Sequence, residues 1–380
     1  MLTMFDDIPL FLVRLLLGFG LGIAVGFVSR RGRFCTLGAV EDAVYAGDTR
    51  RLRSWIVAIG IAIAGVHALE LTAGLDLTRS IYLGARLEWG ALILGGFLFG
   101  LGMALNGTCG LGSLRQLGGG DLRAFVTFLV IGITAMMTMR GLTGVVRVAV
   151  TEPLTLQLPQ GFSQRLPEIA GFGGATASVL AIALGLAVAF AAFGPAGLRT
   201  HYRFALTGAL VGILIVGGWW ATGVAGFDSF DTRRIESFTF VGPLGETLYY
   251  AMLSTALQPD FPVGAVVGVV IGAFIAAWTD GSFKWQVSAD ATDLKRRILG
   301  AGLMGFGGVT ALGCSIGQGV TGLSTLSIGS AIATVAIVAG ARFGLYLLIE
   351  RRRGQPAARR AAAAPAKAAL VRDRISCTEP

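Results

Sequence analysis

The amino-acid sequence predicts an all-α polytopic membrane protein, with about nine transmembrane helices plus four broken or re-entrant elements in two inverted, hourglass-like repeats. The chain of 380 residues is 54% hydrophobic and 14% charged, with a mean hydropathy of +0.72, too apolar for a soluble protein of this length. Glycine supplies 57 residues, about twice its usual share of ~7%, which suits helices that pack closely and break often in a bilayer. Two segments of the first half also resemble two of the second.

Apolar runs of about 20 residues, the length that crosses a bilayer, define the spans. They lie near residues 9–29, 54–74, 88–106, 122–141, 169–193, 203–224, 261–280, 298–313 and 325–348. The chain opens with MLTMFDDIPL, which has acids and no basic residues before its first apolar run. A secretory signal has a basic start and a cleavage site, so we expect the first run to be a retained span.

Basic clusters at the ends of the spans predict which loops face the cytoplasm. They comprise Arg30, Arg31, Arg33, Arg50, Arg51, Arg53, Arg115, Arg123, Arg199, Arg203, Lys284, Lys295, Arg296, Arg297 and Arg351 to Arg353. Two clusters flank residues 34–48, so we expect this piece either to dip into the membrane and return or to lie on the membrane surface. The N-terminus is then outside and the C-terminus cytoplasmic, in a bacterial inner membrane. Residues 351–380 read as a disordered basic tail.

The internal similarity predicts the order of the repeats. GLGMALNGTCGLG (100–112) aligns with GFGGVTALGCSIG (305–317) at an offset of 205, and FCTLGAVEDAVY (34–45) with FTFVGPLGETLY (238–249) at 204. We therefore expect a first repeat over 1–168 with two re-entrant elements, a linker span over 169–202 and a second repeat over 203–350. An odd linker span inverts the second repeat, as in many transporters.

The broken segments predict an interior path for a small anion. Irregular backbone at membrane depth must be covered by protein or line a water-filled cavity. Helix ends there present N–H groups and positive dipole ends to an anion. A thiol that is mostly protonated near neutral pH adds a weak donor and a soft sulfur surface. Such a lining suits a soft, sulfur-bearing anion that is held weakly enough to leave.

Three cysteines lie in the breaks, namely Cys35, Cys109 and Cys314. A lone membrane cysteine usually acts as a small hydrophobe, but the equivalent positions of Cys109 and Cys314 favour substrate contact for that pair. We assign Cys377, in the tail, no role. Polar neighbours that either orient the anion or cap broken helix ends are Asn106, Thr108, Ser113, Ser315, Gln318 and Ser324. For His67 with Glu70, bonding between helices is favoured over a proton relay.

Other classes of site and partner are not predicted. There is no CxxC pair or histidine cluster, so we expect no metal, no cofactor and no disulfide scaffold. No nucleic-acid motif occurs, and the net charge of +9 is explained by membrane orientation. The sequence also lacks GxxxxGK[ST], so an ATP site is not expected.

The stretches RGRFC, GTCGLG and GCSIGQGVTGLS resemble the YeeE/YedE family of membrane proteins, and the resemblance spans about residues 10–348. It implies an inverted repeat of membrane helices with re-entrant loops, and the uptake of thiosulfate by S–H hydrogen bonds from Cys35, Cys109 and Cys314 without covalent change. Well-studied members have a further second-half cysteine. This chain has none between Cys109 and Cys314, and the comparable break reads ESFTFVGP, with Ser237 and Thr239 at hand.

The leading hypothesis is a transporter, not an enzyme, that takes up a small sulfur-containing anion, foremost thiosulfate, through a cysteine-lined central path. Its expected partners are the anion and membrane lipid, and a soluble cytoplasmic sulfur carrier is a further partner that the sequence leaves open. Three alternatives stay open: a transporter of another sulfur or selenium species, a membrane sulfur-relay enzyme that carries a persulfide on one cysteine, and a membrane subunit with no path of its own.

Overall fold

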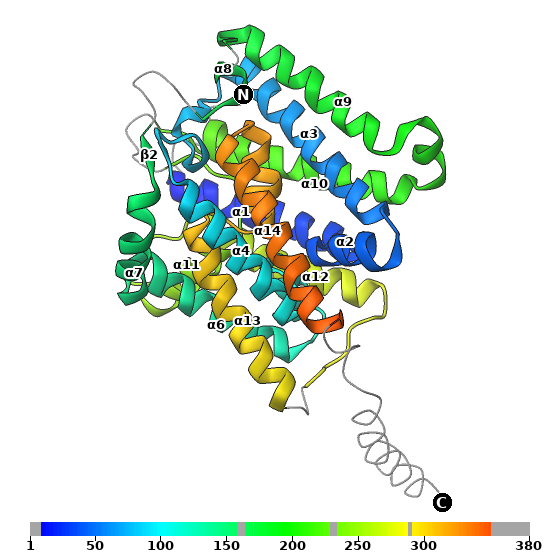
Figure 1. Cartoon of the computed structure of the whole chain (residues 1–380), viewed down its shortest axis with the longest axis vertical. Coiled ribbons are helices and arrows are strands. Elements are labelled where there is room, and N and C mark those ends of the chain that lie inside the picture. Colours follow the sequence, from blue (N-terminus) through cyan, green and yellow to red (C-terminus); the bar gives the residue numbers. More distant parts are fainter. Residues whose placement is uncertain (1–8, 158–163, 170, 229–233, 288–290, 351–380) are drawn as a thin grey trace, which may run out of the picture.

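The computed structural model describes residues 9–157, 164–169, 171–228, 234–287 and 291–350, which are almost entirely helical (Figure 1). The predicted tail, 351–380, lies outside the described residues. Apart from one antiparallel pair of two-residue strands, β1 (Arg86–Leu87) and β2 (Leu156–Gln157), the named elements in the described ranges are helices or helical turns. The prediction of an all-α polytopic membrane protein is confirmed.

Nine long helices in the described residues coincide with the nine predicted spans. They are α1 (Leu10–Arg31), α3 (Arg50–Ala73), α4 (Trp89–Asn106), α6 (Leu122–Arg140), α9 (Gly174–Thr200), α10 (Tyr202–Trp220), α12 (Phe261–Thr279), α13 (Ala291–Thr310) and α14 (Ile328–Leu345). Eight of them lie in segments apolar and long enough to cross a membrane. The exception is α13, which begins earlier than predicted and carries four charged residues in its first turns.

Short helical pieces occupy the four predicted breaks. The first break holds α2 (Thr36–Glu41) and a π-helical turn (Asp42–Ala46), and the second holds α5 (Gly110–Gly118). In the second half, α11 (Val241–Met252) occupies the third break, and a π-helical and 3-10 segment (Gly317–Gly322 and Leu323–Thr325) occupies the fourth. The remaining short α-helices of the described residues are α7 (Leu142–Thr151) and α8 (Leu166–Ile169), and single 3-10 or π-helical turns lie at Leu77–Arg79, Ile81–Leu83, Glu152–Leu154, Ala221–Ala225 and Tyr346–Glu350.

Glycine allows the long helices to approach until their backbones touch. Along α1 and α12, the facing positions are Gly18, Gly22 and Gly26 against Gly264, Gly268 and Gly272. A Cβ atom added at Gly22 would lie 2.6 Å from the carbonyl oxygen of Ala265, and one added at Gly268 would lie 2.3 Å from that of Phe19. The paired positions rise together in sequence, so α1 and α12 run parallel. This close approach, typical of small-residue interfaces in membranes, explains the high glycine content.

The same kind of contact joins the other helices of the bundle. Glycines bring α4 against both α13 and α14, and α10 against α3. α6 packs on α13, and α9 packs on the outer side of α3 at one edge of the bundle (Figure 1). These contacts bury most of the second and fourth breaks and the first turns of α2 and α11, whereas the π-helical turn Asp42–Ala46 has no buried residue.

An ion pair fixes the chain near the far end of α3. Arg165 makes two hydrogen bonds to the Glu70 carboxylate, at 2.8 and 2.6 Å, and Ser178 on α9 donates to Glu70 Oε2 at 2.8 Å. The Arg165 side chain is 7% exposed. Beside it, the backbone N–H of Leu166 donates to Leu326 O at 3.0 Å, at the end of the fourth break. The bond between Glu70 and α9 is interhelical, as predicted, but the same prediction is wrong for His67, whose Nδ1 lies 2.9 Å from Ile63 O of its own helix.

Replacing Arg165 with leucine should destabilise the protein by about 3–5 kcal/mol, because it leaves the Glu70 carboxylate without its cation in a nearly buried site. The measurement is thermal unfolding of the purified protein in detergent. Arg53→Gln, an exposed arginine at the opposite end of α3, is the matched control and should unfold like the wild type. A double variant, Glu70→Gln with Arg165→Leu, should recover part of the loss. Equal unfolding temperatures for Arg165→Leu and Arg53→Gln would contradict the assignment.

Candidate functional site

Three free thiols converge at the centre of the bundle from three different breaks. Cys35 immediately precedes α2, Cys109 immediately precedes α5, and Cys314 lies three residues before the π-helical turn of the fourth break. The Cys109 sulfur lies within electrostatic range of the sulfurs of Cys35 and Cys314. Cys109 and Cys314 are 3% and 1% exposed, whereas Cys35 is half-buried. The thiols thus lead from the buried core toward one surface.

Hydroxyl and amide donors surround Cys314. The Thr239 hydroxyl donates to its sulfur at 3.8 Å, and the backbone N–H of Gly317 donates at 3.4 Å. A Cβ atom at Gly317 would lie 2.5 Å from Thr239 Oγ1 and 3.5 Å from the hydroxyl oxygen of Tyr82. Gly317 therefore leaves room for two hydroxyl groups beside the thiol. An anion beside Cys314 would find weak hydrogen-bond donors in the hydroxyl groups and the backbone N–H. None of these groups carries a positive charge.

A hydrogen bond connects the first and fourth breaks beside the thiols. The Thr36 hydroxyl donates to Ser315 Oγ at 2.9 Å, and both side chains are buried. Ser315 also lies within hydrogen-bonding range of the Cys109 sulfur. The sequence analysis named Ser315 but missed Thr36, although it follows Cys35 directly. It also missed Tyr82, which comes from a loop with no local signal of a site.

The backbone turns sharply just before the second and fourth breaks. Gly107 adopts φ +84° and Leu312 adopts φ +57°, both in the left-handed region. These positions differ by 205, the offset that aligns the two cysteine segments. Glycine adopts this conformation readily, whereas a leucine does so at a cost of about 1–2 kcal/mol. The left-handed conformation of Leu312 is therefore stabilised by tertiary packing and not by the intrinsic preference of the residue.

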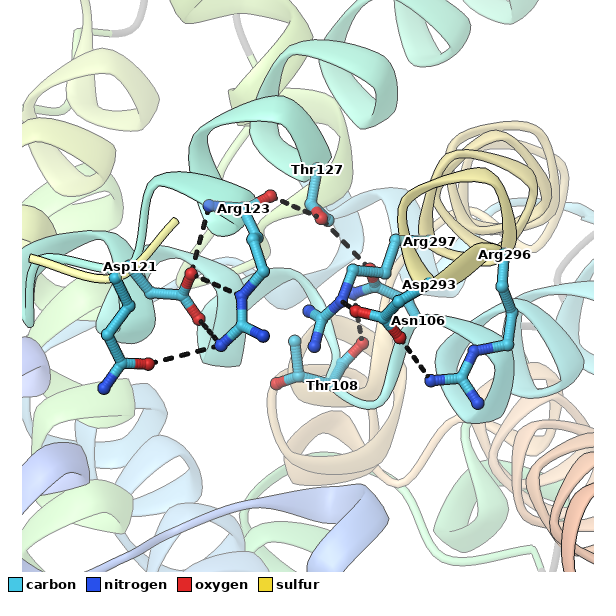
Figure 2. A network of polar contacts seen from close by, with 9 residues as sticks. Asn106, Thr108, Asp121, Arg123, Thr127, Asp293, Arg296 and Arg297 are labelled. Atoms are coloured by element: carbon cyan, nitrogen blue, oxygen red, sulfur yellow. Dashed lines mark hydrogen bonds and ion pairs between the residues drawn. The ribbon is translucent and has the colours of Figure 1, made fainter. Parts of the chain in front are cut away.

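Several of the predicted polar residues bind the protein's own backbone. Asn106 Nδ2 donates to Thr108 O at 3.1 Å, and Thr127 on α6 donates to Asn106 Oδ1 at 3.0 Å (Figure 2). The side chains of three others donate to carbonyl oxygens: Ser113 to Cys109 O, Ser237 to Ile215 O and Gln318 to Ala311 O. Thr108 Oγ1 and Gln318 Oε1 are buried with no hydrogen-bond partner. Thr239 and Ser315 are the members of the set that approach the thiols.

Figure 2 also shows charged side chains on either side of Asn106, which we call the ionic belt. Asp121 and Arg123 lie at the start of α6, and Asp293, Arg296 and Arg297 lie at the start of α13. Asp121 accepts hydrogen bonds from Arg123, and Arg123 also donates to Gln286 at 3.2 Å. Asp293 pairs with Arg296 and Arg297 at 2.7 and 2.8 Å. The bond from Thr127 fixes the loop that precedes Cys109 against α6, whereas the ion pairs of Asp293 lie within α13. The charges of the ionic belt are paired with each other, so they are structural.

A cavity of about 700 Å³ opens on the surface where α1 ends, and we call it the basic vestibule. Its lining consists of Arg30, Arg31, Arg33, Cys35, Leu37, Gly38, Glu41, Arg51, Gly107, Arg115, Gln116, Asp280 and Ser282. Five arginines therefore face two carboxylates, and Cys35 forms part of the same wall. The vestibule places positive charge where the row of thiols reaches the surface.

Metal chemistry has no candidate in the described ranges, where no group of three or more His, Cys, Asp or Glu residues is placed to hold an ion. The fold is that of a multi-pass membrane protein with a buried row of thiols at its centre. Residues 31–343 match the model of the family described as sulphur transport, and the chain belongs to this family.

Two curated relatives have a stated substrate. The thiosulfate transporter TsuA of Escherichia coli (strain K12) is 28% identical over 351 residues, which cover 87% of this chain and 93% of the relative. The thiosulfate transporter TsuA of Spirochaeta thermophila is 26% identical over 345 residues, covering 88% and 99%. The family and both relatives are transporters, in agreement with the prediction that this chain is a transporter and not an enzyme.

Proposed function

We propose that this protein takes up thiosulfate through a central path in which the anion passes from Cys314 to Cys109 and then to Cys35 and the basic vestibule. The observation that carries the proposal is the convergence of three free thiols from three breaks, with Cys109 in range of both others. Similarity to two thiosulfate transporters over most of the chain supports the same substrate.

The chemistry of the path favours a soft divalent anion. Each thiol offers a weak S–H donor and a polarizable sulfur, and Thr239, Ser315 and Tyr82 add hydroxyl donors near them. Many weak contacts bind an anion without holding it, as conduction through a narrow path requires. An arginine beside Cys109 would bind it more tightly and slow its release. The positive charge is instead concentrated in the vestibule.

We further propose that residues 1–168 and 203–350 are inverted repeats joined by the linker span 169–202. Three features support this. Thr239 contacts Cys314 and is the repeat partner of Cys35, which lies in range of Cys109. Gly107 and Leu312 share a backbone conformation at the repeat offset. Helix α1 packs parallel to α12. The proposed repeat relates α1 to α10 and α3 to α12, and α10 likewise packs parallel to α3.

The orientation and surroundings belong to the same proposal. The vestibule arginines mark the cytoplasmic side by the positive-inside rule, which puts the N-terminus outside and the C-terminus inside, in a bacterial inner membrane. A soluble sulfur carrier would then receive the anion at the vestibule. The persulfide alternative is less well supported, because the groups in contact with Cys314 are a hydroxyl and an amide, with no cation among them to stabilise a thiolate.

The test is growth of a sulfur-auxotrophic bacterium that lacks its own thiosulfate uptake. Expression of the wild-type chain should restore growth on thiosulfate as sole sulfur source and the uptake of ³⁵S-thiosulfate. An empty vector is the negative control, and immunodetection in the membrane fraction confirms expression. Absence of growth and uptake despite normal expression would refute thiosulfate as the substrate.

A further inference from the structure

The basic vestibule contains arginines that have no acidic partner. Arg31 pairs with Asp280 at 3.0 Å, and Arg51 pairs with Asp42 at 3.2 Å. By contrast, Arg30, Arg33 and Arg115 have no carboxylate within 4.0 Å among the described residues. The cavity wall thus combines two arginines that form ion pairs with three that do not, although Asp280 also attracts Arg30 from beyond ion-pair distance.

The hydrogen bonds of Arg30 and Arg115 hold their side chains inside the cavity wall. Arg30 donates to the backbone oxygen of Arg115 at 3.1 Å and to Ser282 Oγ at 3.2 Å. Arg115 donates to the carbonyl oxygens of Ser29 and Phe34, at 3.3 and 3.4 Å. Carbonyl oxygens are neutral acceptors, so these bonds fix the position of the guanidinium groups without cancelling their charge. Two like charges are therefore held near each other.

Orientation alone does not explain this arrangement. Arginines that mark the cytoplasmic side extend toward water and need no common cavity. Here the Phe34 carbonyl, bound by Arg115, directly precedes Cys35, and a Cβ atom at Gly38 would lie 2.5 Å from Arg51 Nη1. The arginines thus pack against the very turn that carries the thiol. A guanidinium fork matches the geometry of a small oxyanion.

We propose that the basic vestibule is an anion-binding site of its own, formed by Arg30, Arg33 and Arg115 beside Cys35, which binds small divalent oxyanions such as sulfate as well as thiosulfate. The proposal rests on the proposed function for its biological meaning. On the cytoplasmic side, the site collects the transported anion as it leaves Cys35. A cytoplasmic oxyanion that occupies the site then slows further release, so that uptake is inhibited by accumulated product or by sulfate.

The modification rate of Cys35 measures both the charge and the occupancy of the vestibule. The protein is the purified full-length chain with Cys377→Ser, which removes the thiol of the tail, and Cys109 and Cys314 are buried. The reagents are an anionic and a cationic methanethiosulfonate of similar size. We expect the anionic reagent to react at least about tenfold faster than the cationic one at low ionic strength. Equal rates would overturn the proposal.

Occupancy is tested with sulfate, which has no nucleophilic sulfur to consume the reagent. Sulfate at millimolar concentration should slow modification of Cys35 by a neutral maleimide, relative to chloride at the same ionic strength. Arg115→Gln and, separately, Arg33→Gln should raise the sulfate concentration for half-protection by about tenfold. The Arg33 side chain makes no hydrogen bond to the backbone of the described residues, so this variant covers the case in which Arg115→Gln fails to fold. No difference between sulfate and chloride would refute the site.

Arg50→Gln is the matched control. Arg50 lies near the vestibule but does not line it. It is bound to Asp48, and this guanidinium holds the pKa of the Asp48 carboxyl at about 2. In Arg50→Gln, sulfate should protect Cys35 at the same concentration as in the wild type. If Arg50→Gln and Arg115→Gln lose protection by sulfate equally, the proposal of a defined site is contradicted. If the wild-type chain fails to take up thiosulfate but sulfate still protects Cys35, the proposed function fails and the anion site stands.

Discussion

Replacing Cys314 with alanine should reduce the initial rate of thiosulfate uptake by at least about tenfold, and Cys109→Ala should do the same. Each substitution removes the donor and the soft sulfur at a point where the path is formed by few groups. A hydrogen bond to a charged partner contributes about 1.5–3 kcal/mol, which corresponds to roughly a tenfold to hundredfold change in rate. The measurement is ³⁵S-thiosulfate uptake, normalised to the amount of protein in the membrane.

Serine separates two roles of the thiol. Cys314→Ser keeps a hydroxyl donor, so hydrogen bonding predicts an intermediate rate. A persulfide on Cys314 instead predicts the same loss of rate as in Cys314→Ala, together with a sulfane-sulfur adduct in the intact mass of the wild-type protein that is absent from both variants. Cys377→Ala, which replaces the tail cysteine, is the control and should transport like the wild type. Full activity of a Cys109→Ala and Cys314→Ala double variant would show that the chain has no thiol path.

Gly26→Ala should destabilise the protein by about 3 kcal/mol, the upper end of the usual range for an overpacked interior. A Cβ atom at this position would lie 2.2 Å from Val269 O and 2.9 Å from Ala273 N. Both atoms belong to the backbone of α12, so no side chain can turn away to make room. Helices α1 and α12 must separate, and their other glycine contacts are weakened as well. Thermal unfolding in detergent, together with the yield of folded protein, measures the effect.

Gly20→Ala is the matched control on the same helix. No heavy atom lies within 4 Å of a Cβ atom at Gly20, so the added methyl group enters open space. Alanine also has a better helix propensity than glycine. We expect this variant to unfold at or above the temperature of the wild type. A loss of stability in Gly20→Ala as large as in Gly26→Ala would show that close contact with α12 is not the cause.

Hydropathy was sufficient to predict the long helices, because the bilayer imposes a length and an apolar composition on each of them. The start of α13 was missed for the same reason: its first turns contain four charged residues, Asp293, Lys295, Arg296 and Arg297, of which Asp293 forms ion pairs with the two arginines within the helix. Glycine in broken segments correctly indicated short helices at the four breaks. These signals are local and can be found in a single sequence.

Tertiary features of the site had no such local signal. Arg30 and Arg115 are far apart in the sequence, and each alone reads as part of a basic cluster at the end of a span. Only the packing of α5 against α1 and α12 brings them to one cavity. The sequence also left two roles open for each polar side chain of the breaks, namely to orient an anion or to bind the backbone. Only the tertiary contacts of each side chain distinguish these roles. Asn106 is occupied by Thr108 and Thr127, whereas Thr239 faces the Cys314 sulfur.

The hydrogen bond between Thr36 and Ser315 joins two breaks from opposite halves of the chain, beside the thiols of the proposed path. An ion that passes between them must part these hydroxyl groups, and an oxyanion can accept a hydrogen bond from each of them in place of the one that is lost. A sodium or potassium ion could be bound only through the lone pairs of the two hydroxyl oxygens, and an apolar molecule offers no replacement for the hydrogen bond. The free-energy cost of parting the two hydroxyl groups is therefore offset most fully by an oxyanion, which accepts a hydrogen bond from both.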